Sequence, residues 1–362
     1  MSSRSSALVL LAPAFPALES ETNWVPSQQV FVAAMRERYP DVRLIVLTFY
    51  YPNERKPYRW RGVDVIPFDG REHRRVRRWI FWRRIWKELN RIRSEYELHG
   101  LLSFWVGECA AVGHYFGIRY GIPHYSWICG QDARATNKWV RRIRPAAGEL
   151  IAMSDFLVEE FARNHGIRPL RMIPNAIDPG VFPVASGGRR DIHLLAVGSL
   201  SRLKRYKIFI DAVAIIRPSL PSVRAVLCGE GEERQQLVEL ADQYRLGGHL
   251  TMTGELPHEE VLGLMQRTKI FLHPSEYEGF GIVCLEALYA GAHVISMCKP
   301  LKEDIPHWHV VANEEEMIRK VLSLLEQESL DDASVVRYTI KESVEEIMGL
   351  YAGRTGNSTP GW

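Results

Sequence analysis

The sequence predicts an α/β protein with two domains, each built on a mostly parallel sheet covered by helices. The chain has 362 residues, 46% of them hydrophobic, which exceeds one ordinary core and suits two domains of about 170 residues each. Short apolar runs alternate with amphipathic stretches, the pattern of parallel strands joined by helices. A segment rich in Ala, Ser, Gly and Arg at residues 185–191 indicates a linker between the two halves.

The domain boundaries follow from these observations. We expect a first domain at residues 1–183 and a second domain at residues 184–330. A long amphipathic helix is expected within residues 331–352, at about 332–351. The polar tail at residues 353–362 is expected to be disordered.

The first domain is expected to hold a parallel sheet whose strands come from short apolar runs. These runs lie at residues 7–11, 43–48, 63–66, 100–104, 124–128, 149–152 and 171–173. The loop after the first run contains Phe15 and Trp24 and leads to a helix at residues 27–38. Ligands of α/β sheets bind at the carboxyl ends of strands, so this loop is in the expected place for a site.

The most unusual local composition lies between Arg71 and Arg93. Residues 71–93 contain ten Lys or Arg and two Glu, a net charge of +8. A stripe at helical spacing runs through Val76, Trp79, Trp82, Trp86, Leu89 and Ile92. One interpretation is a helix that buries this stripe on the sheet and exposes its charges. The other is contact with anionic membrane lipid, which a basic helix with tryptophans favours.

The second domain is expected to alternate strands and helices in the same way. Strands are predicted at residues 192–197, 223–228, 269–272 and 292–296, and helices at residues 204–216, 258–267 and 314–325. Glycine turns follow the first two strands. Such turns at the start of a helix are suited to holding phosphate, although a short glycine pattern alone is weak evidence.

Charge and cysteine usage narrow the class of protein. Residues 1–170 carry 26 Lys or Arg against 17 Asp or Glu, a net +9, and residues 171–362 carry 20 against 26, a net −6. The acidic second half makes nucleic-acid binding an unfavoured use of the basic segment. Five widely spaced cysteines indicate neither a disulfide framework nor a metal site, and no apolar run is long enough to span a membrane. We expect a cytoplasmic protein, at the inner face of the membrane if the basic helix contacts lipid.

The chain is organised around residues 273–296. Two carboxylates, Glu278 and Glu286, lie on either side of the turn Gly279-Phe280-Gly281, with seven residues between them. The turn separates a buried strand from a helix at residues 282–290, whose first N–H groups lack partners and favour an anion. A plain strand, loop and helix is the alternative interpretation.

This stretch resembles the signature of retaining glycosyltransferases of the GT-B fold, of the family 4 type, also described as glycosyl transferases group 1. Their pattern runs P-S-x-x-E-G-F-G-x-x-x-x-E-A-x-x-x-G, and every fixed letter is present from Pro274 to Gly291. The resemblance implies two Rossmann-like domains that face each other across a cleft, with the last helix crossing back to the first domain. It also implies transfer of a sugar from a nucleotide-diphosphate sugar to an acceptor hydroxyl, such as a glycan or a lipid-linked sugar.

The resemblance also assigns roles to individual residues. Lys204 would neutralise the diphosphate, Glu286 would bind the ribose, and Glu278 would contact the donor sugar. The remaining substrate contacts would come from Ser275, Gly279, Phe280 and Gly281 in the signature, and from Gly254 and Leu256 beside the base. No metal or other cofactor is implied, and the sequence contains no Asp-x-Asp metal motif.

Three departures from the family pattern are visible. Ser199 stands where a second phosphate-binding arginine is usual, so Arg202 or Arg205 would have to replace it, and Arg202 is the candidate substitute. In the H-G-x-D element Cys129 replaces the histidine, so Gln131 or Asp132 would have to supply the polar groups. Asp132 is the candidate catalytic residue of the first domain, and a plain helix cap is its alternative interpretation. The glycine pair usual in the first loop is absent. A sugar-nucleotide epimerase, a noncatalytic nucleotide-binding protein and a membrane-surface adaptor are the alternative functions.

Overall fold

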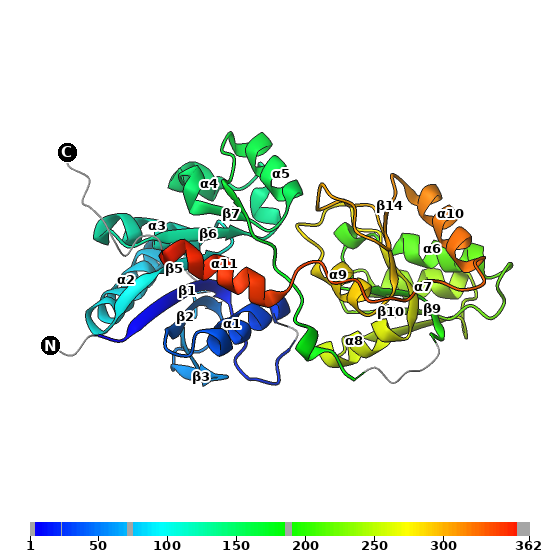
Figure 1. Cartoon of the computed structure of the whole chain (residues 1–362), viewed down its shortest axis with the longest axis horizontal. Coiled ribbons are helices and arrows are strands. Elements are labelled where there is room, and N and C mark those ends of the chain that lie inside the picture. The colour runs from blue at the N-terminus through cyan, green and yellow to red at the C-terminus, as the bar shows by residue number, and fades with distance from the viewer. Residues whose placement is uncertain (1–3, 23, 71–74, 185–189, 353–362) are drawn as a thin grey trace. The chain divides into compact units, whose positions relative to one another are not determined.

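The computed structural model describes residues 4–22, 24–70, 75–184 and 190–352 (Figure 1). The expected tail and most of the expected linker lie outside these residues. The chain divides into two compact units. The first unit comprises Met1–Asn175 and Ile340–Trp362, and the second comprises Ala176–Thr339.

The first unit is built on an eight-stranded sheet. All neighbouring strands are parallel except the first pair, which forms a short antiparallel edge. The strands, in their order in the sheet, are β3 (Tyr58–Trp60), β4 (Val63–Pro67), β2 (Arg43–Tyr51), β1 (Ser6–Ala14), β5 (Glu97–Phe104), β6 (His124–Ile128), β7 (Leu150–Ala152) and β8 (Arg171–Met172). The central β1 is buried along residues 7–12 because a parallel sheet has helices on both faces.

The helices of the first unit come from both ends of the chain. They are α1 (Pro26–Arg38), α2 (Arg75–Glu95), α3 (Glu108–Tyr120), α4 (Lys138–Ile143), α5 (Asp155–His165) and α11 (Ile340–Ala352). In α11, Tyr351 is fully buried and its hydroxyl donates to the carbonyl of Leu101 in β5 at 2.9 Å. A side chain at Gly100 would collide with the Tyr351 ring, so this glycine admits the last helix to the sheet.

The basic helix α2 corrects one prediction. Its buried stripe is formed by Phe81, Ile85, Leu89 and Ile92, all at most 2% exposed. Trp79, which one of the two interpretations of this helix places on the sheet, is 64% exposed. Phe, Ile and Trp occupy neighbouring positions here, so two apolar stripes fit the helical period. The stripe that packs on the sheet is the less bulky one, with Phe81 and Ile85 in place of the tryptophans. The side chain of Val76 lies outside the described residues.

The second unit contains a six-stranded, fully parallel sheet. Its strands, in spatial order, are β11 (Leu250–Gly254), β10 (Ala225–Cys228), β9 (Ile192–Val197), β12 (Thr268–His273), β13 (His293–Ser296) and β14 (Trp308–Val310). Its helices are α6 (Lys207–Ile216), α7 (Arg234–Gln243), α8 (His258–Gln266), α9 (Ile282–Tyr289) and α10 (Glu314–Leu325). The two-unit parallel α/β architecture predicted from the sequence is confirmed.

Several element bounds differ from the predictions. Strand β11 was not predicted, and neither were the short edge strands β3 and β14. The expected helix at 332–351 begins only at Ile340, since residues 330–338 have no helical backbone. Within the described residues, no helix is both long and apolar enough to cross a membrane.

Candidate active site

The predicted donor-binding residues lie in the second unit, at the carboxyl ends of four neighbouring strands. In the sheet order β11-β10-β9-β12, the first strand ends at Gly254, and the loops after the other three carry Gly229, Lys204 and Glu278 respectively. Loops that follow adjacent parallel strands meet at one edge of the sheet. The fold therefore gathers residues that are more than 70 positions apart in the chain, such as Lys204 and Glu278.

Glycine allows the turns after β9 and β10 to interlock. The amide of Gly198 donates to the carbonyl of Cys228 at 3.0 Å, and that of Leu200 donates to the carbonyl of Glu230 at 2.8 Å. Gly229 has φ 143°, and a side chain there would lie 1.9 Å from the Gly198 oxygen. Only glycine permits this contact. The glycine pattern at residues 229–231 thus serves backbone packing next to the site.

Lys204 and Glu278 are bound to each other. Lys204 closes the 3-10 turn η4 (Arg202–Lys204), and Glu278 lies in the loop after β12. The amide of Glu276 donates to the carbonyl of Leu203 at 3.0 Å, which docks one loop on the other. As a result, Lys204 Nζ lies 2.5 Å from Glu278 Oε2 in a partly buried ion pair.

His273 is a second partner of Glu278. Its Nε2 lies 3.1 Å from the same oxygen, Oε2, and its side chain is 2% exposed. Burial opposes ionisation of Glu278, but the hydrogen bond from His273 and the charge of Lys204 outweigh it and lower the pKa of Glu278 to about 2. For His273, burial disfavours the charged imidazole and lowers its pKa. The carboxylate is therefore held ionised between a lysine and a neutral imidazole.

Glu286 lies one turn into α9, beyond the glycine turn. Gly281 precedes the helix with φ 73°, a left-handed conformation that glycine adopts without strain. Glu286 Oε1 lies 2.8 Å from His258 Nε2, at the start of α8. Burial opposes protonation of His258, but the hydrogen bond to Glu286 outweighs it and raises the pKa of the imidazole above its usual value.

Two other residues of the signature are buried. Ser275 is fully buried, and its hydroxyl has no hydrogen-bond partner among the described residues. Phe280 is 4% exposed and contacts the Tyr338 ring at 6.2 Å between centroids. Phe280 thus anchors the turn, while Gly279 and Gly281 provide its backbone.

The predicted phosphate and base contacts differ in exposure. Ser199 and Arg202 are both exposed, whereas Lys204 is partly buried. Arg205 Nη1 lies 3.8 Å from the sulfur of Met297, which turns its guanidinium toward β13. Gly254 is the last residue of β11, and Leu256 lies in the loop between β11 and α8.

Asp132 lies in the first unit, in the short turn η1 (Gln131–Ala133) after β6. Its carboxylate accepts the amides of Val106 at 2.9 Å, Cys129 at 3.1 Å and Gly130 at 2.8 Å. Burial raises its pKa against the effect of these hydrogen bonds. Its contacts are thus those of a residue that fixes the loop.

The glycine-free loop after β1 is held by side chains. Gln29 donates to the carbonyls of Glu21 at 2.7 Å and Trp24 at 2.6 Å, and the Trp24 ring stacks on Tyr51 at 4.2 Å. Phe15 is buried against Trp60.

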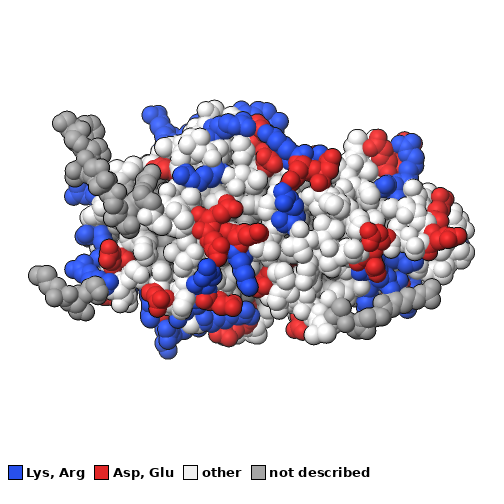
Figure 2. All heavy atoms as spheres, in the orientation of Figure 1, with Lys and Arg blue, Asp and Glu red and all other residues white. Residues whose placement is uncertain are grey.

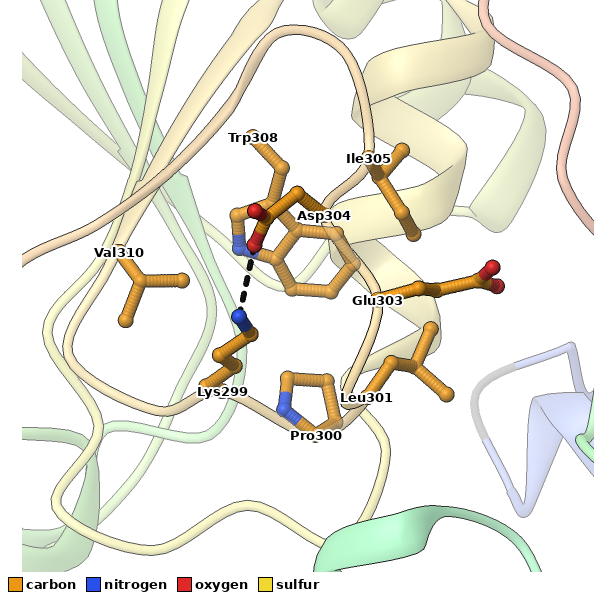
Figure 3. Close-up of a pocket in the computed structure, with 8 residues that line it drawn as sticks. All are labelled: Lys299, Pro300, Leu301, Glu303, Asp304, Ile305, Trp308 and Val310. Carbon is orange, nitrogen blue, oxygen red and sulfur yellow. Dashed lines mark hydrogen bonds and ion pairs between the residues drawn. The ribbon is translucent and has the colours of Figure 1, made fainter.

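A small hollow follows β13 and is lined by residues 299–310 alone (Figure 3). Lys299 and Asp304, two of the residues that line it, form an ion pair of 2.7 Å (Figure 3). No predicted site residue lines this hollow.

Sequence reasoning missed the two histidines that contact the motif glutamates. His273 is the residue directly before the Pro274-Ser275 pair, and His258 is the first residue of a predicted helix. The only available signal was their position at the carboxyl end of a strand and at a helix start next to a proposed ligand loop.

The fold and these geometric features define a protein of the GT-B class. The pneumococcal O-GlcNAc transferase GtfA, solved with UDP and GlcNAc, matches with a TM-score of 0.68 and 13% identity over 96% of this chain and 99% of that one. Anabaena HepE, solved with UDP and glucose, matches with a TM-score of 0.66 and 16% identity over 95% and 94%.

Residues 188–341, most of which lie in the second unit, match the family model described as glycosyl transferases group 1. The gpi3 subunit of Schizosaccharomyces pombe phosphatidylinositol N-acetylglucosaminyltransferase is 30% identical over 207 residues, which cover 55% of this chain and 45% of that protein. Mycobacterium tuberculosis glycogen synthase is 31% identical over 179 residues, 48% of this chain and 43% of that protein. The matched segments thus span less than half the length of these relatives.

Proposed function

We propose that the protein is a glycosyltransferase that moves a sugar from a nucleotide-diphosphate sugar to an acceptor hydroxyl with retention of anomeric configuration. One observation carries the proposal: Lys204, Glu278 and Glu286 are gathered around the glycine turn that opens α9. A cation, an ionised carboxylate and a second carboxylate at a helix start are suited to a diphosphate, a sugar and a ribose respectively.

The proposed chemistry assigns each group one task. Lys204 and the backbone amides at the start of α9 neutralise the diphosphate as it leaves. Glu278 faces the sugar, where positive charge develops at the anomeric carbon and an ionised carboxylate is stabilising. Glu286 accepts the ribose hydroxyls. No step in this assignment uses a metal ion, since lysine and helix amides offset the phosphate charge.

The donor is proposed to be a UDP-sugar in the first instance. The names of two structures with the same fold include UDP, and the names of the curated relatives include an N-acetylglucosaminyltransferase. The purified chain should release nucleoside diphosphate when incubated with a panel of UDP-, GDP- and ADP-sugars and a glycan or lipid-linked acceptor. NMR of the product should show the anomeric configuration of the donor.

The same assay separates the alternatives. A noncatalytic nucleotide-binding protein would bind the diphosphate and release none from the sugar nucleotide. An epimerase would change the sugar without releasing nucleotide. Glu278→Gln serves as the inactive control, since it retains the size of the side chain and removes its charge.

A second proposal concerns the acceptor, which we infer to be a lipid-linked or membrane-proximal sugar reached through α2. Trp79 and Ile80 are 64% and 53% exposed, and with Arg83, Arg84 and Lys87 they line a groove on this helix. Figure 2 shows several Lys and Arg side chains over the α2 end of the first unit, beside fewer Asp and Glu. Basic residues near an anionic leaflet contribute about 1 kcal/mol each, and tryptophan is favoured at headgroup depth.

Liposome flotation tests this second proposal. The chain should float with vesicles that contain phosphatidylserine, less so at high salt, and not with neutral vesicles. Arg83→Gln/Lys87→Gln should reduce flotation. The control Arg234→Gln/Arg319→Gln removes the same charge from exposed ion pairs of the second unit and should not. Equal flotation of both variants, or recovery with neutral vesicles, contradicts the proposal.

A further inference from the structure

We infer that His258 is a positioning residue that fixes the Glu286 carboxylate for the ribose of the donor nucleotide. The inference rests on the proposed function, because it takes Glu286 as the acceptor of the ribose hydroxyls. It adds a residue from a different helix to the nucleotide site, outside the signature that contains both glutamates.

The first argument is the contact itself. His258 Nε2 lies 2.8 Å from Glu286 Oε1, and the two side chains are 21% and 12% exposed. Helices α8 and α9 pack against each other, so the contact joins two elements of the rigid sheet cover. A glutamate has several rotatable bonds, and a hydrogen bond on one oxygen limits its orientations before any ligand arrives. The described contact engages Oε1, so Oε2 is the oxygen assigned to a ribose hydroxyl.

The second argument is where His258 is attached. It is the first residue of α8, directly after Pro257, whose extended backbone sets the direction of the helix. The preceding loop begins at Gly254, with φ 74°, and the Gly254 carbonyl accepts the amide of Gly229 at 2.8 Å. One anchored corner therefore carries both the proposed base contacts and the imidazole that holds the ribose-binding carboxylate. Base recognition and ribose recognition are mechanically linked through it.

The third argument is charge. Burial opposes protonation of His258, but the hydrogen bond to Glu286 outweighs it and raises the pKa of the imidazole above its usual value, so the contact favours a charge-assisted pair. The other carboxylates near His258 in sequence, Glu255, Glu259 and Glu260, are exposed. The buried imidazole therefore pairs with Glu286 and not with these exposed carboxylates.

Three substitutions separate positioning from packing. His258→Phe keeps a ring and removes the hydrogen bond, and His258→Asn keeps an amide that is too short to reach Glu286. His258→Gln keeps an amide at about the reach of Nε2. The control is His249→Phe, at a half-buried histidine that precedes β11 at the opposite end of the strand from Gly254.

The experiment is calorimetric titration of the full chain with UDP, GDP and ADP, and then with the 2′,3′-dideoxy form of whichever binds. For wild type and His249→Phe, removal of the ribose hydroxyls should weaken binding about tenfold or more. The ratio to compare is that of the dissociation constants of the dideoxy and ribose forms. For His258→Phe and His258→Asn this ratio should approach one, and His258→Gln should recover most of the wild-type ratio. Circular dichroism and thermal unfolding confirm that each variant is folded.

The outcomes distinguish the positioning role of His258 from the ribose-binding role of Glu286. If His258→Phe and His258→Asn keep the full ratio while Glu286→Ala loses it, the positioning role is overturned and the ribose role of Glu286 stands. If Asn and Gln at position 258 behave alike, the reach of the side chain is irrelevant and positioning is again overturned. If wild type binds ribose and dideoxyribose forms equally, the ribose assignment fails and the inference falls with it.

Discussion

Lys204 Nζ lies 2.5 Å from Glu278 Oε2, so the cation proposed for the diphosphate and the carboxylate proposed for the sugar are bound to each other. A diphosphate that pairs with Lys204 must replace Glu278 as the partner of its ammonium group. His273, at 3.1 Å from the same oxygen, then retains the carboxylate. The site is thus arranged for an exchange of partners on donor binding.

The phosphate role of Lys204 can be tested by removing its charge. Lys204→Ala should weaken binding of the nucleoside diphosphate by about 1.5–3 kcal/mol, the range for hydrogen bonds to charged groups. Arg202→Ala should cost much less, because this side chain is exposed. Calorimetry of both variants decides between them. An equal loss would mean that Arg202 takes the place of the arginine replaced by Ser199.

Glu278 is expected to act on the rate rather than on binding. Glu278→Gln should leave the affinity for nucleoside diphosphate nearly unchanged and lower turnover by about a hundredfold or more, because its contact strengthens as charge develops on the sugar. Steady-state release of the nucleoside diphosphate gives kcat and KM separately. An unchanged kcat would mean that Glu278 has only a structural role in its loop.

Glu286 should show the opposite behaviour. Glu286→Ala should weaken nucleotide binding by about 1–3 kcal/mol, since hydrogen bonds from the ribose lose a charged acceptor. The fold should persist, because the side chain is partly exposed and lies at the edge of the site. Wild-type affinity in this variant, measured by calorimetry, would refute the ribose role.

The pH dependence of turnover should depend on His273. The pKa of Glu278 is lowered to about 2, so its carboxylate remains ionised well below pH 4.5. Removal of the hydrogen bond in His273→Leu takes away one cause of the lowering, and the pKa of Glu278 should move up toward its ordinary value. Turnover should then fall on acidification at a higher pH than in wild type. Coincident acid limbs in a profile carried down to about pH 3 would contradict this link.

Gly229 should be essential to the second unit. Gly229→Ala places a carbon where the Gly198 oxygen lies and forces φ 143° on a residue with a side chain. We expect a loss of about 3 kcal/mol or more in the free energy of unfolding. Gly247→Ala is the control, because nothing lies within 4 Å of the added carbon there. Similar unfolding curves for both variants would show that the turns can separate.

The sequence was most informative where the site is local in the chain. The signature from Pro274 to Gly291 contains a strand end, a turn and a helix start, so its order in sequence is also its order in space. The residue pattern alone therefore predicted that Glu278 and Glu286 lie at one strand end. The pairing of Lys204 with Glu278 depends on β9 lying beside β12, a neighbour relation that strand patterns alone do not specify.

Prediction was weakest where the local signals were degenerate. In α2 the neighbouring residues Trp79, Ile80 and Phe81 are all apolar, so periodicity did not determine which one faces the sheet. Strands β3 and β14 have three residues each, too few to show alternation. The histidine partners lie outside the signature or at its border, and only contact in three dimensions identifies them.

The bridge between Ile177 and Thr339 brings the two ends of the second unit side by side. In chain order this unit is an insertion between two segments that together complete the first unit. Such an arrangement allows the second unit to be exchanged as one piece, because its two chain ends lie next to each other. It also affects the order of folding during synthesis, because the first unit lacks α11 until the whole second unit has been translated.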